Sequence, residues 1–291
     1  MTGFIDGHAH VFRPATEVPR VVDDLAPADR SAGVDDLLAN LEDIGGSGAV
    51  LVPLGVEDAT AAAALADHPG RFAGVAVAGP DDVGPAGPAH LAARAETYPF
   101  GAVRMMSFGP PGQPLVDSPA WPTLQLMAER DWVLWSYLGP QQAPYLLDLV
   151  AALPTLRIVL NHLGFTPVDM HVDSHRRPRF TGGIADPDVE RVLRLSDHEQ
   201  VHLMVSGHYA LSETEPPYDD LRTVTRRLVG AYGAERSLWA SDSPWPATVP
   251  GYADTFHAAE QLLGSLEAAA HADIFGDTVR RLFPDSFLET T

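Results

Sequence analysis

Short apolar runs recur along the chain, and residues with helical spacing follow each of them. Such runs are typical of strands buried on both faces, and amphipathic helices between them predict a parallel sheet covered by helices. The predicted strands span residues 4–11, 48–54, 72–78, 101–108, 132–138, 156–163, 201–208 and 237–242. Apolar residues three and four positions apart predict three of the helices, at 34–44, 145–153 and 221–232.

Eight strand and helix units predict a closed (β/α)8 barrel, the TIM barrel, which commonly reaches the 291 residues of this chain as one domain. The alternative is an open doubly wound sheet, but no glycine-rich dinucleotide fingerprint follows the first predicted strand. Stretches rich in proline and glycine at 79–88 and 109–122 are predicted to be loops of the barrel, not linkers. We therefore predict one α/β domain over residues 1–291.

The composition limits the partners of the protein. A formal net charge of −20 disfavours nucleic acid and anionic membranes, because a phosphate-binding surface needs an excess of Lys and Arg. The absence of cysteine excludes disulfides and thiolate metal sites. No basic region followed by an apolar run opens the sequence, and no apolar stretch approaches the ~18 residues that span a bilayer. We expect a cytoplasmic protein that acts on a small molecule, in an oligomeric state that the sequence leaves open.

Two histidines lie at the end of the first predicted strand, in the stretch FIDGHAHVF. His8 and His10 share one face of this strand, because alternate residues of a strand point to the same side. In a (β/α)8 barrel the chemistry lies at the carboxyl ends of the strands. The spacing of the pair therefore predicts that both side chains point into the mouth of the barrel.

Two further ionisable residues end the sixth and eighth predicted strands. His162 follows on the face of the apolar residues of its strand, which are Leu156, Ile158 and Leu160. Asp242 lies on the apolar face of the eighth strand, in the stretch WASDSPWP. Each residue taken alone could be a core or rim residue, and Asp242 could cap the next helix. Because all of them lie at strand ends, however, we predict that they converge with His8 and His10 on one site.

Four stretches resemble the amidohydrolase superfamily, and within it the lactonase branch that includes 2-pyrone-4,6-dicarboxylate lactonase and sugar-acid lactonases. They read IDGHAHVF, ALPTLRIVLNHLG, VHLMVSG and YDDLRTVTRRLVGAYGAERSLWASDSPWP. The superfamily fold is the barrel that the periodicity predicts. The resemblance implies that Asp242 is the general base, that His8 and His10 line the reaction centre, and that His162 is a catalytic histidine.

The sequence departs from this superfamily in two strands. Metal-dependent members usually place a histidine ligand at the end of the fifth strand, where this chain reads WVLWSYL. His8, His10 and Asp242 remain as ligands for one divalent metal, Zn²⁺, because three protein ligands plus water can hold a catalytic zinc. The pyrone-lactonase relatives resemble this pattern and work without metal, so we favour hydrolysis that requires no cofactor. The branch also often has a lysine before the Ser-Gly of the seventh strand, but here Met204 and Val205 precede Ser206 and Gly207.

The expected reaction is the hydrolytic opening of a lactone or a related cyclic ester. Asp242, with a pKa raised by its apolar surroundings, would activate water, and the histidines would stabilise the carbonyl oxygen. Arg104 lies inside the fourth predicted strand, where a cation is costly to bury unless a substrate carboxylate or an acidic side chain meets it. We therefore expect an anionic substrate. The residues predicted to bind it are Arg104, Tyr137, Ser206, His208, Arg176 and Trp245.

Two other functions remain open at this stage. One is a zinc-dependent decarboxylase or hydratase of the related decarboxylase branch, which the missing histidine of the fifth strand disfavours. The other is a barrel that binds ligands without catalysis, which gives the four converging polar residues no clear use. Proton release without CO2 would separate the hydrolase from the decarboxylase. Binding without turnover across a panel of lactones would favour the third reading.

Overall fold

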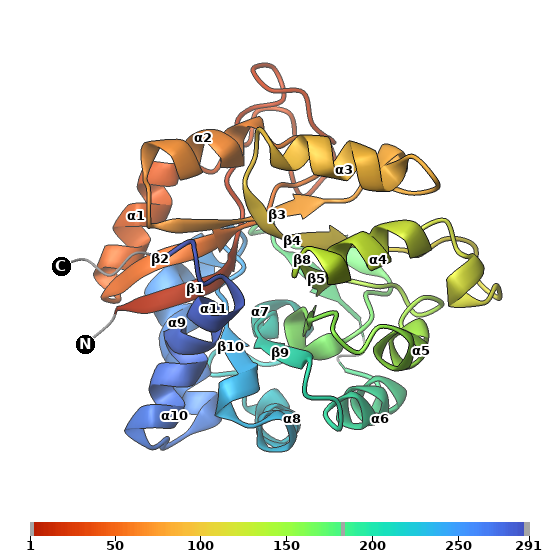
Figure 1. Cartoon of the computed structure of the whole chain (residues 1–291). Helices are drawn as coiled ribbons and strands as arrows, with labels where there is room; N and C mark the ends of the chain where they lie inside the picture. The colour runs from red at the N-terminus through yellow and green to blue at the C-terminus, as the bar shows by residue number, and fades with distance from the viewer. Residues whose placement is uncertain (1–2, 182–183, 288–291) are drawn as a thin grey trace.

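A parallel sheet of eight strands forms the centre of the protein, which a computed structural model describes over residues 3–181 and 184–287 (Figure 1). The strands follow one another around the sheet in chain order, and all neighbouring pairs are parallel. They are β1 (Phe4–Ala9), β2 (Gly46–Leu51), β3 (Phe72–Val77), β4 (Phe100–Met105), β5 (Val133–Ser136), β6 (Ile158–Leu160), β9 (Val201–Val205) and β10 (Ser237–Trp239). Each lies within or close to a predicted strand.

The first and last strands meet and close the sheet into a barrel. Their contact continues beyond β10, where the backbone N–H of Asp242 donates to the carbonyl of His8 at 3.0 Å. The N–H of His10 donates in turn to the carbonyl of Ser243 at 2.7 Å. The predicted (β/α)8 barrel is therefore confirmed, and its closing seam passes through residues that the sequence predicts to be functional.

Helices surround the barrel on its outer side (Figure 1). Those on the outer side are α1 (Val34–Asp43), α2 (Ala59–Asp67), α3 (Gly87–Ala95), α4 (Trp121–Glu129), α5 (Tyr145–Ala152), α6 (Asp186–Leu195), α8 (Arg222–Tyr232), α9 (Tyr252–Leu263) and α10 (Ala268–Ala272). Two short helices lie at the ends of the barrel instead: α7 (His208–Leu211) follows the carboxyl end of β9, and α11 (Thr278–Leu282) contributes to the barrel interior. The three helices predicted from periodicity correspond to α1, α5 and α8. Their apolar faces pack on the outward-pointing side chains of the strands in one large cluster. Because alternate residues of a strand point to the same side, this cluster contains every second residue of a strand, such as Ala49 and Leu51 of β2.

The inside of the barrel is filled by a second apolar cluster. Ile5, Val75 and Trp135 are among the strand residues that point inward, and all are essentially inaccessible to solvent. Leu282, the last residue of α11, and Phe283, which follows it, belong to the same cluster. The segment that contains α11 thus plugs the barrel at the amino ends of its strands (Figure 1). The opposite, carboxyl ends are therefore left for chemistry.

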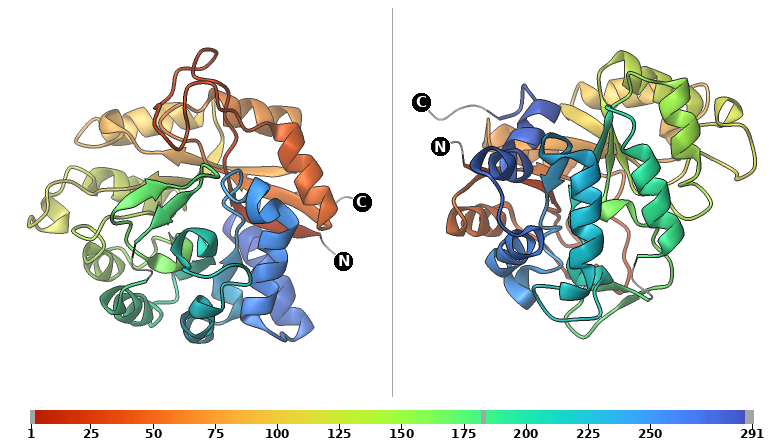
Figure 2. Two further views of the ribbon diagram at one scale, coloured as in Figure 1. Left: turned by 180° about the vertical axis from the view of Figure 1, so that it is seen from behind. Right: turned by 90° about the horizontal axis from the view of Figure 1, so that it is seen from below.

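A two-stranded hairpin in the long loop after β6 was not predicted. It consists of β7 (Met170–Val172) and β8 (Pro178–Phe180), which pair antiparallel. The ion pair between Arg177 and Asp173, at 2.8 Å, holds its turn. Strands of three residues carry too little periodicity to be recognised in a sequence. Figure 2 shows the hairpin in green across the side of the molecule opposite to that of Figure 1.

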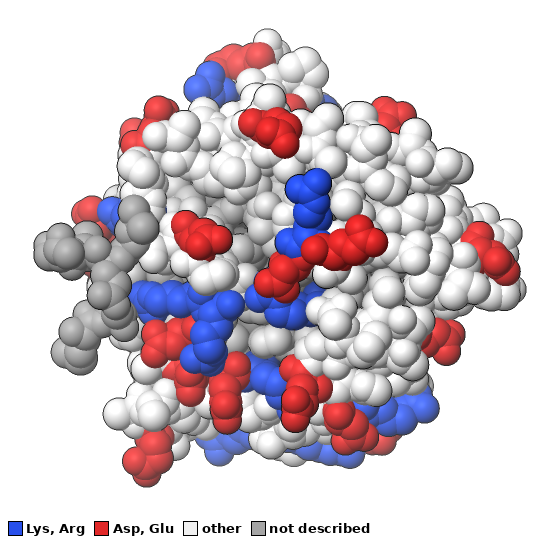
Figure 3. Space-filling model, viewed as in Figure 1, with Lys and Arg blue, Asp and Glu red and all other residues white. Residues whose placement is uncertain are grey.

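Charges are mixed on the face shown in Figure 3, where basic side chains near the centre lie beside acidic ones. No helix in the described ranges is long and apolar enough to cross a membrane.

Candidate active site

A cavity of about 320 Å³ opens at the carboxyl ends of the strands. Its walls come from strand ends, from the loop around residues 21–26 and from the β7–β8 hairpin. The lining residues are His10, Val21, Asp23, Leu25, Ala26, Leu54, Arg104, Met106, Tyr137, His162, Phe165, Met170, Pro178, Phe180, Gly207, Tyr209, Ala210, Asp242 and Trp245. Three of the four ionisable residues that were predicted to converge, His10, His162 and Asp242, therefore share one cavity.

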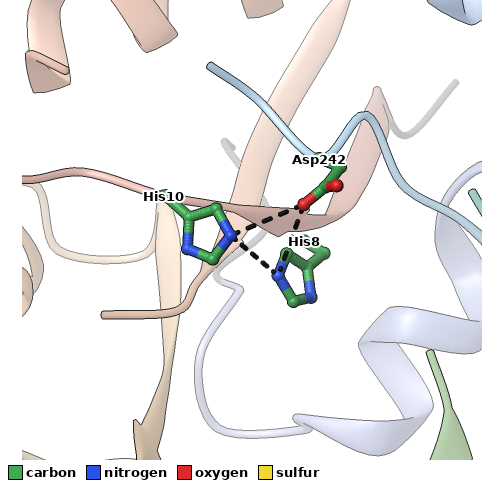
Figure 4. Close-up of side chains that lie close together, drawn as sticks. All are labelled: His8, His10 and Asp242. Atoms are coloured by element: carbon green, nitrogen blue, oxygen red, sulfur yellow. Dashed lines mark hydrogen bonds and ion pairs between the residues drawn. The ribbon is translucent and has the colours of Figure 1, made fainter. Parts of the chain in front are cut away.

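His8, His10 and Asp242 form a buried cluster at the closing seam (Figure 4). The Nε2 atoms of the two histidines lie 3.3 Å apart. Asp242 Oδ1 lies 3.7 Å from His8 Nε2 and 3.5 Å from His10 Nε2. His8 is not part of the cavity wall, since it is fully buried between His10 and Trp135. His8 therefore lies next to His10 and Asp242 as predicted, but on the side of them that faces away from the cavity.

The hydrogen bonds of the two rings define their tautomers. The indole N–H of Trp135 donates to His8 Nδ1 at 2.9 Å, and an indole nitrogen can only donate. Neutral His8 therefore carries its proton on Nε2. His10 Nδ1 lies 2.6 Å from the carbonyl oxygen of Val52, which can only accept, so this Nδ1 carries a proton. In neutral His10 the Nε2 lone pair is then free to accept from His8 Nε2–H, which completes a chain of satisfied hydrogen bonds.

The spacing of this cluster suits zinc, but its protonation does not. A tetrahedral ion with bonds of about 2.0–2.2 Å keeps its ligand atoms ~3.3–3.6 Å apart, which is close to the three separations observed here. A ligating histidine, however, normally donates its second ring N–H to an acceptor. His8 instead receives a bond from Trp135 on that nitrogen and holds its proton on Nε2. The hydrogen-bonded cluster therefore does not fit a zinc site that uses His8.

Asp242 is held as an ionised carboxylate. Burial alone would raise its pKa, but His162, His10 and the hydrogen bond from Tyr209 outweigh burial and lower the pKa below its ordinary value. The Tyr209 hydroxyl donates to Oδ2 at 2.6 Å, whereas the buried Oδ1 has no hydrogen-bond partner among the described residues. The predicted raised pKa of Asp242 is wrong, because the expectation considered its apolar neighbours and not the opposing effects of His162, His10 and the Tyr209 hydroxyl. Oδ1, which lies 3.5 Å from His10 Nε2, can accept a proton.

His162 reaches the cavity by a different route from the predicted one. Leu160 and the alternate residues before it point outward and pack on the helices, so the face that was predicted to carry His162 inward is the wrong one. The strand ends at Leu160, and the backbone of His162 adopts a positive φ of 49° that turns its side chain into the mouth. Gly207 makes room, because a Cβ at this position would lie 2.9 Å from that of His162.

The electrostatic environment keeps His162 neutral at pH 7. Burial lowers its pKa to about 4, although Asp242 opposes the shift. Its Nδ1 lies 2.8 Å from the Ser206 hydroxyl, and its Nε2 lies 3.9 Å from Asp242 Oδ2. Ser206 is thus buried behind His162 and does not line the cavity. It positions the ring rather than facing a ligand.

Arg104 enters the cavity without a partner of opposite charge. Its guanidinium lies over the ring of Tyr137, with Cζ 4.7 Å from the ring centroid. In the described part of the chain Arg104 forms no ion pair, and its buried Nε has no hydrogen-bond partner. Burial lowers the pKa of Arg104, while Tyr137 and Asp242 oppose the shift. An unpaired cation in a cavity is costly for a protein alone and is suited to an anionic ligand.

The other predicted binding residues divide between the cavity and its surroundings. Tyr137 and Trp245 line the cavity, and the Trp245 ring lies 5.5 Å from that of His10. His208 is buried elsewhere, with Nε2 3.2 Å from the Thr225 hydroxyl of α8. Arg176 is exposed in the turn of the β7–β8 hairpin, outside the cavity lining. The structure therefore does not bring His208 or Arg176 to the cavity.

Sequence reasoning missed three polar contacts of this site. Tyr209, the partner of Asp242, directly follows His208 in the stretch SGHY, which was its only signal. Trp135 lies in the stretch WVLWSYL, and nothing in the sequence identified it as the donor to His8. Asp6 lies behind the cluster and accepts bonds from the backbone of His8 at 3.1 Å and from the Tyr252 hydroxyl at 2.9 Å. Burial raises the pKa of Asp6 to about 6, although these bonds oppose the rise.

Comparison with known proteins identifies the relatives of this chain. A family profile described as Amidohydrolase matches residues 5–284. Among curated proteins, the L-fucono-1,5-lactonase of Burkholderia ambifaria is 25% identical over 162 residues, which are 55% of this chain and 51% of that protein. The match therefore spans about half the length of this relative.

Solved structures match over nearly the whole chain. A Pseudomonas putida protein described as a 2-pyrone-4,6-dicarboxylic acid hydrolase has a TM-score of 0.75 and 27% identity, over 99% of this chain and 100% of that chain. An amidohydrolase of Burkholderia multivorans with bound zinc has a TM-score of 0.74 and 18% identity, over 97% of this chain and 99% of that chain. At this lower identity the second likeness shows the fold alone.

Proposed function

The chain belongs to the amidohydrolase family, and from that premise we propose that it is a hydrolase that opens a lactone or a related cyclic ester bearing a carboxylate. The observation that carries the proposal is the presence, in one cavity, of an ionised Asp242 and of Arg104. Among the described residues, Asp242 Oδ1 has no hydrogen-bond partner and Arg104 has no carboxylate partner. The first can take a proton from water. The second can hold an anionic group of the substrate.

In the proposed reaction a water molecule lies against Asp242 Oδ1 and attacks the lactone carbonyl carbon. Its proton passes to Oδ1, and the carbonyl oxygen becomes an oxyanion. His162, neutral and facing the cavity, donates to this oxyanion when its Nε2 carries the proton, an arrangement in which Ser206 donates to Nδ1. The ring C–O bond then breaks, and the proton on Asp242 goes to the leaving oxygen. The product is a hydroxy acid, or an enol that bears a carboxylic acid when the leaving oxygen is enolic. In either case the new carboxyl group releases one proton at neutral pH.

We further propose that this hydrolysis requires no metal. Support comes from the hydrogen bond of Trp135 to His8, which sets the tautomer that does not suit ligation. Activity should survive chelation and dialysis, with residual metal measured in the same sample. If activity falls in proportion to zinc and returns when zinc is added, the metal-free mechanism is wrong.

Asp242→Asn tests the proposed reaction. The two side chains are nearly isosteric, but an amide does not take a proton from water, so hydrolysis should fall by at least ~10³-fold while the protein stays folded. Proton release is followed with a pH indicator across a lactone panel, with CO2 measured in parallel. Asp81→Asn, which removes the same charge from an exposed position outside the cavity, is the control. Parental activity of Asp242→Asn, or CO2 release by the parent protein, would refute the proposal.

A further inference from the structure

The cavity contains one free cation among the described residues, Arg104. Other arginines lie near the mouth, but protein groups already engage them. Three donate to backbone carbonyls, and one pairs with a carboxylate of the β7–β8 hairpin. They are Arg20, Arg30, Arg179 and, for the ion pair, Arg177. The cavity is therefore equipped to bind a single carboxylate.

The remaining charges of the cavity are negative. Asp242 is ionised, and Asp23 adds a second carboxylate to the lining. Asp23 Oδ1 accepts a backbone N–H, from Ala26 at 2.6 Å, and no cation within the described ranges forms an ion pair with Asp23. A second carboxylate on the substrate would meet repulsion from these groups and would find no guanidinium.

Neutral polar side chains that could pair with the hydroxyls of a ligand are few here. Among the described lining residues there is no Ser, Thr, Asn, Gln or Lys. The hydroxyl of Tyr209 is already used by Asp242, which leaves Tyr137 as the other hydroxyl-bearing side chain among the described lining residues. A polyhydroxylated ring would lose its hydrogen bonds to water on entering this cavity and regain few of them.

Apolar and aromatic groups form most of the wall instead. We call Tyr137, Phe165 and Phe180 the aromatic wall: the rings of Phe165 and Phe180 lie 4.9 Å apart in an edge-to-face arrangement, and Phe165 lies 6.3 Å from Tyr137. These rings continue from the side of the cavity that holds Arg104 towards the hairpin. Such a surface suits a planar, apolar group.

The outer edge of the cavity is apolar as well. We call Val21, Met106 and Met170 the rim, whose side chains are 66%, 55% and 49% exposed although they line the cavity. Large apolar side chains gathered at a cavity entrance are typical of a ligand-binding surface. A substrate that extends past the aromatic wall would cover them.

From these observations we propose that the substrate is a lactone with one carboxylate and an apolar, planar substituent, rather than a dicarboxylate or a sugar lactone. Arg104 binds the carboxylate, and the aromatic wall and the rim take the substituent. This inference rests on the proposed lactonase function, so its test combines turnover with binding.

Turnover is compared on matched pyrones. 4-Phenyl-2-pyrone-6-carboxylate and 2-pyrone-4,6-dicarboxylate differ only in the group that would meet the aromatic wall, and an aldonolactone represents the hydroxylated class. We expect kcat/KM for the phenyl compound to exceed that for the dicarboxylate by ~10- to 100-fold, and the aldonolactone to react slowest. A preference for the dicarboxylate or the aldonolactone would overturn the inference.

Calorimetric binding separates the two proposals, because its probes have no ester bond. Biphenyl-3-carboxylate should bind ~10-fold or more tightly than isophthalate, and 3-phenylbenzamide, which lacks the charge, should bind more weakly than biphenyl-3-carboxylate. This order without turnover of any lactone would refute the lactonase function and support the ligand class. Turnover with equal or tighter binding of isophthalate would refute the ligand class alone, and so would absence of binding by all three probes.

A charge introduced at the rim provides a second test. Met106→Arg places a cation at an exposed lining position and should reduce the preference for the phenyl compound over the dicarboxylate by at least ~5-fold. Val116→Arg adds the same charge at a position that is 54% exposed and outside the lining, so it should leave the preference unchanged. Equal effects of the two variants would indicate general electrostatics and contradict the assignment of the rim.

Discussion

Replacement of Trp135 by phenylalanine should increase the affinity of the His8, His10 and Asp242 cluster for zinc. In the parent protein the indole N–H donates to His8 Nδ1 at 2.9 Å, so a zinc ion on Nε2 requires the proton to move to Nδ1. Two buried N–H groups would then face each other without an acceptor. Phenylalanine removes one of them and keeps an aromatic ring in the barrel interior.

The size of the effect follows from the number of buried donors left without a partner. Each costs about 1–3 kcal/mol, so zinc binding loses ~2–6 kcal/mol in the parent protein and ~1–3 kcal/mol in the variant. The difference corresponds to zinc affinity ~5- to 150-fold tighter in Trp135→Phe. The wider ring of tryptophan also fills the core, so some loss of stability accompanies the exchange.

Zinc affinity is measured by competition with a chromophoric chelator, and the His8 tautomer by ¹⁵N NMR. Trp132→Phe is the matched control, because Trp132 packs on Phe100 outside the barrel interior. His8→Ala shows how much of the zinc signal belongs to this cluster. If the parent protein and Trp135→Phe bind zinc equally through His8, or if Nδ1 of His8 carries the proton in the parent protein, the tautomer argument is refuted.

Three further substitutions test other parts of the site. Arg104→Met should lower kcat/KM for an anionic lactone by ~10- to 100-fold and for a neutral lactone much less. The substitution should also raise the melting temperature, because it removes a buried cation that has no carboxylate partner in the described part of the chain. Equal kinetic losses for the two lactones would point to a structural role of Arg104. Tyr209→Phe removes a hydrogen bond that lowers the pKa of Asp242, so the acid limb of the pH profile of kcat/KM should move to higher pH. An acid limb that stays at the same pH would contradict the role of Asp242 as the base. Burial raises the pKa of Asp6 from 3.8 to about 6, so the folded protein holds this proton more tightly than the unfolded chain does. The unfolding free energy of the parent protein relative to that of Asp6→Asn should therefore be highest below pH ~4 and decrease by ~3 kcal/mol as the pH rises through about 6. Urea unfolding at both ends of this pH window measures the difference, and a constant difference would refute the shift.

The strands and the closed barrel could be predicted because a parallel strand buried on both faces leaves an apolar run that no loop imitates. It could also be predicted that His8 and His10 share a face, because the side chains of a strand alternate with a period of two residues. Trp135 could not be assigned to His8, because β1 and β5 are not neighbours in the sheet. The contact crosses the barrel interior. It depends on the relative positions of β1 and β5 along the barrel axis, which the sequence alone does not reveal.

The local period failed where the backbone leaves the sheet. The prediction that His162 belongs to the site rested on the wrong face of its strand. Leu160, on the same face, points outward, and the positive φ of His162 reverses the direction of its side chain. Asp242 has a positive φ of 62° as well. Non-glycine residues in this region cost of order 1 kcal/mol or more and persist where surrounding contacts impose them. A rule based on alternation therefore predicts that a strand end is functional, but not which way its last side chain points.

The same geometry predicts that the side chain of Asp242 can be changed without loss of the fold. The backbone N–H of Asp242, not its carboxylate, donates to His8 across the closing seam, and His10 and Ser243 bond there through their backbones too. Asparagine keeps these backbone bonds and the Oδ atom that accepts from Tyr209, and it replaces only the unpartnered oxygen. The seam thus fixes the position of the base through main-chain contacts, while its side chain remains free for chemistry. Loss of activity in Asp242→Asn would accordingly report on proton transfer, provided that its unfolding free energy stays near that of the parent protein.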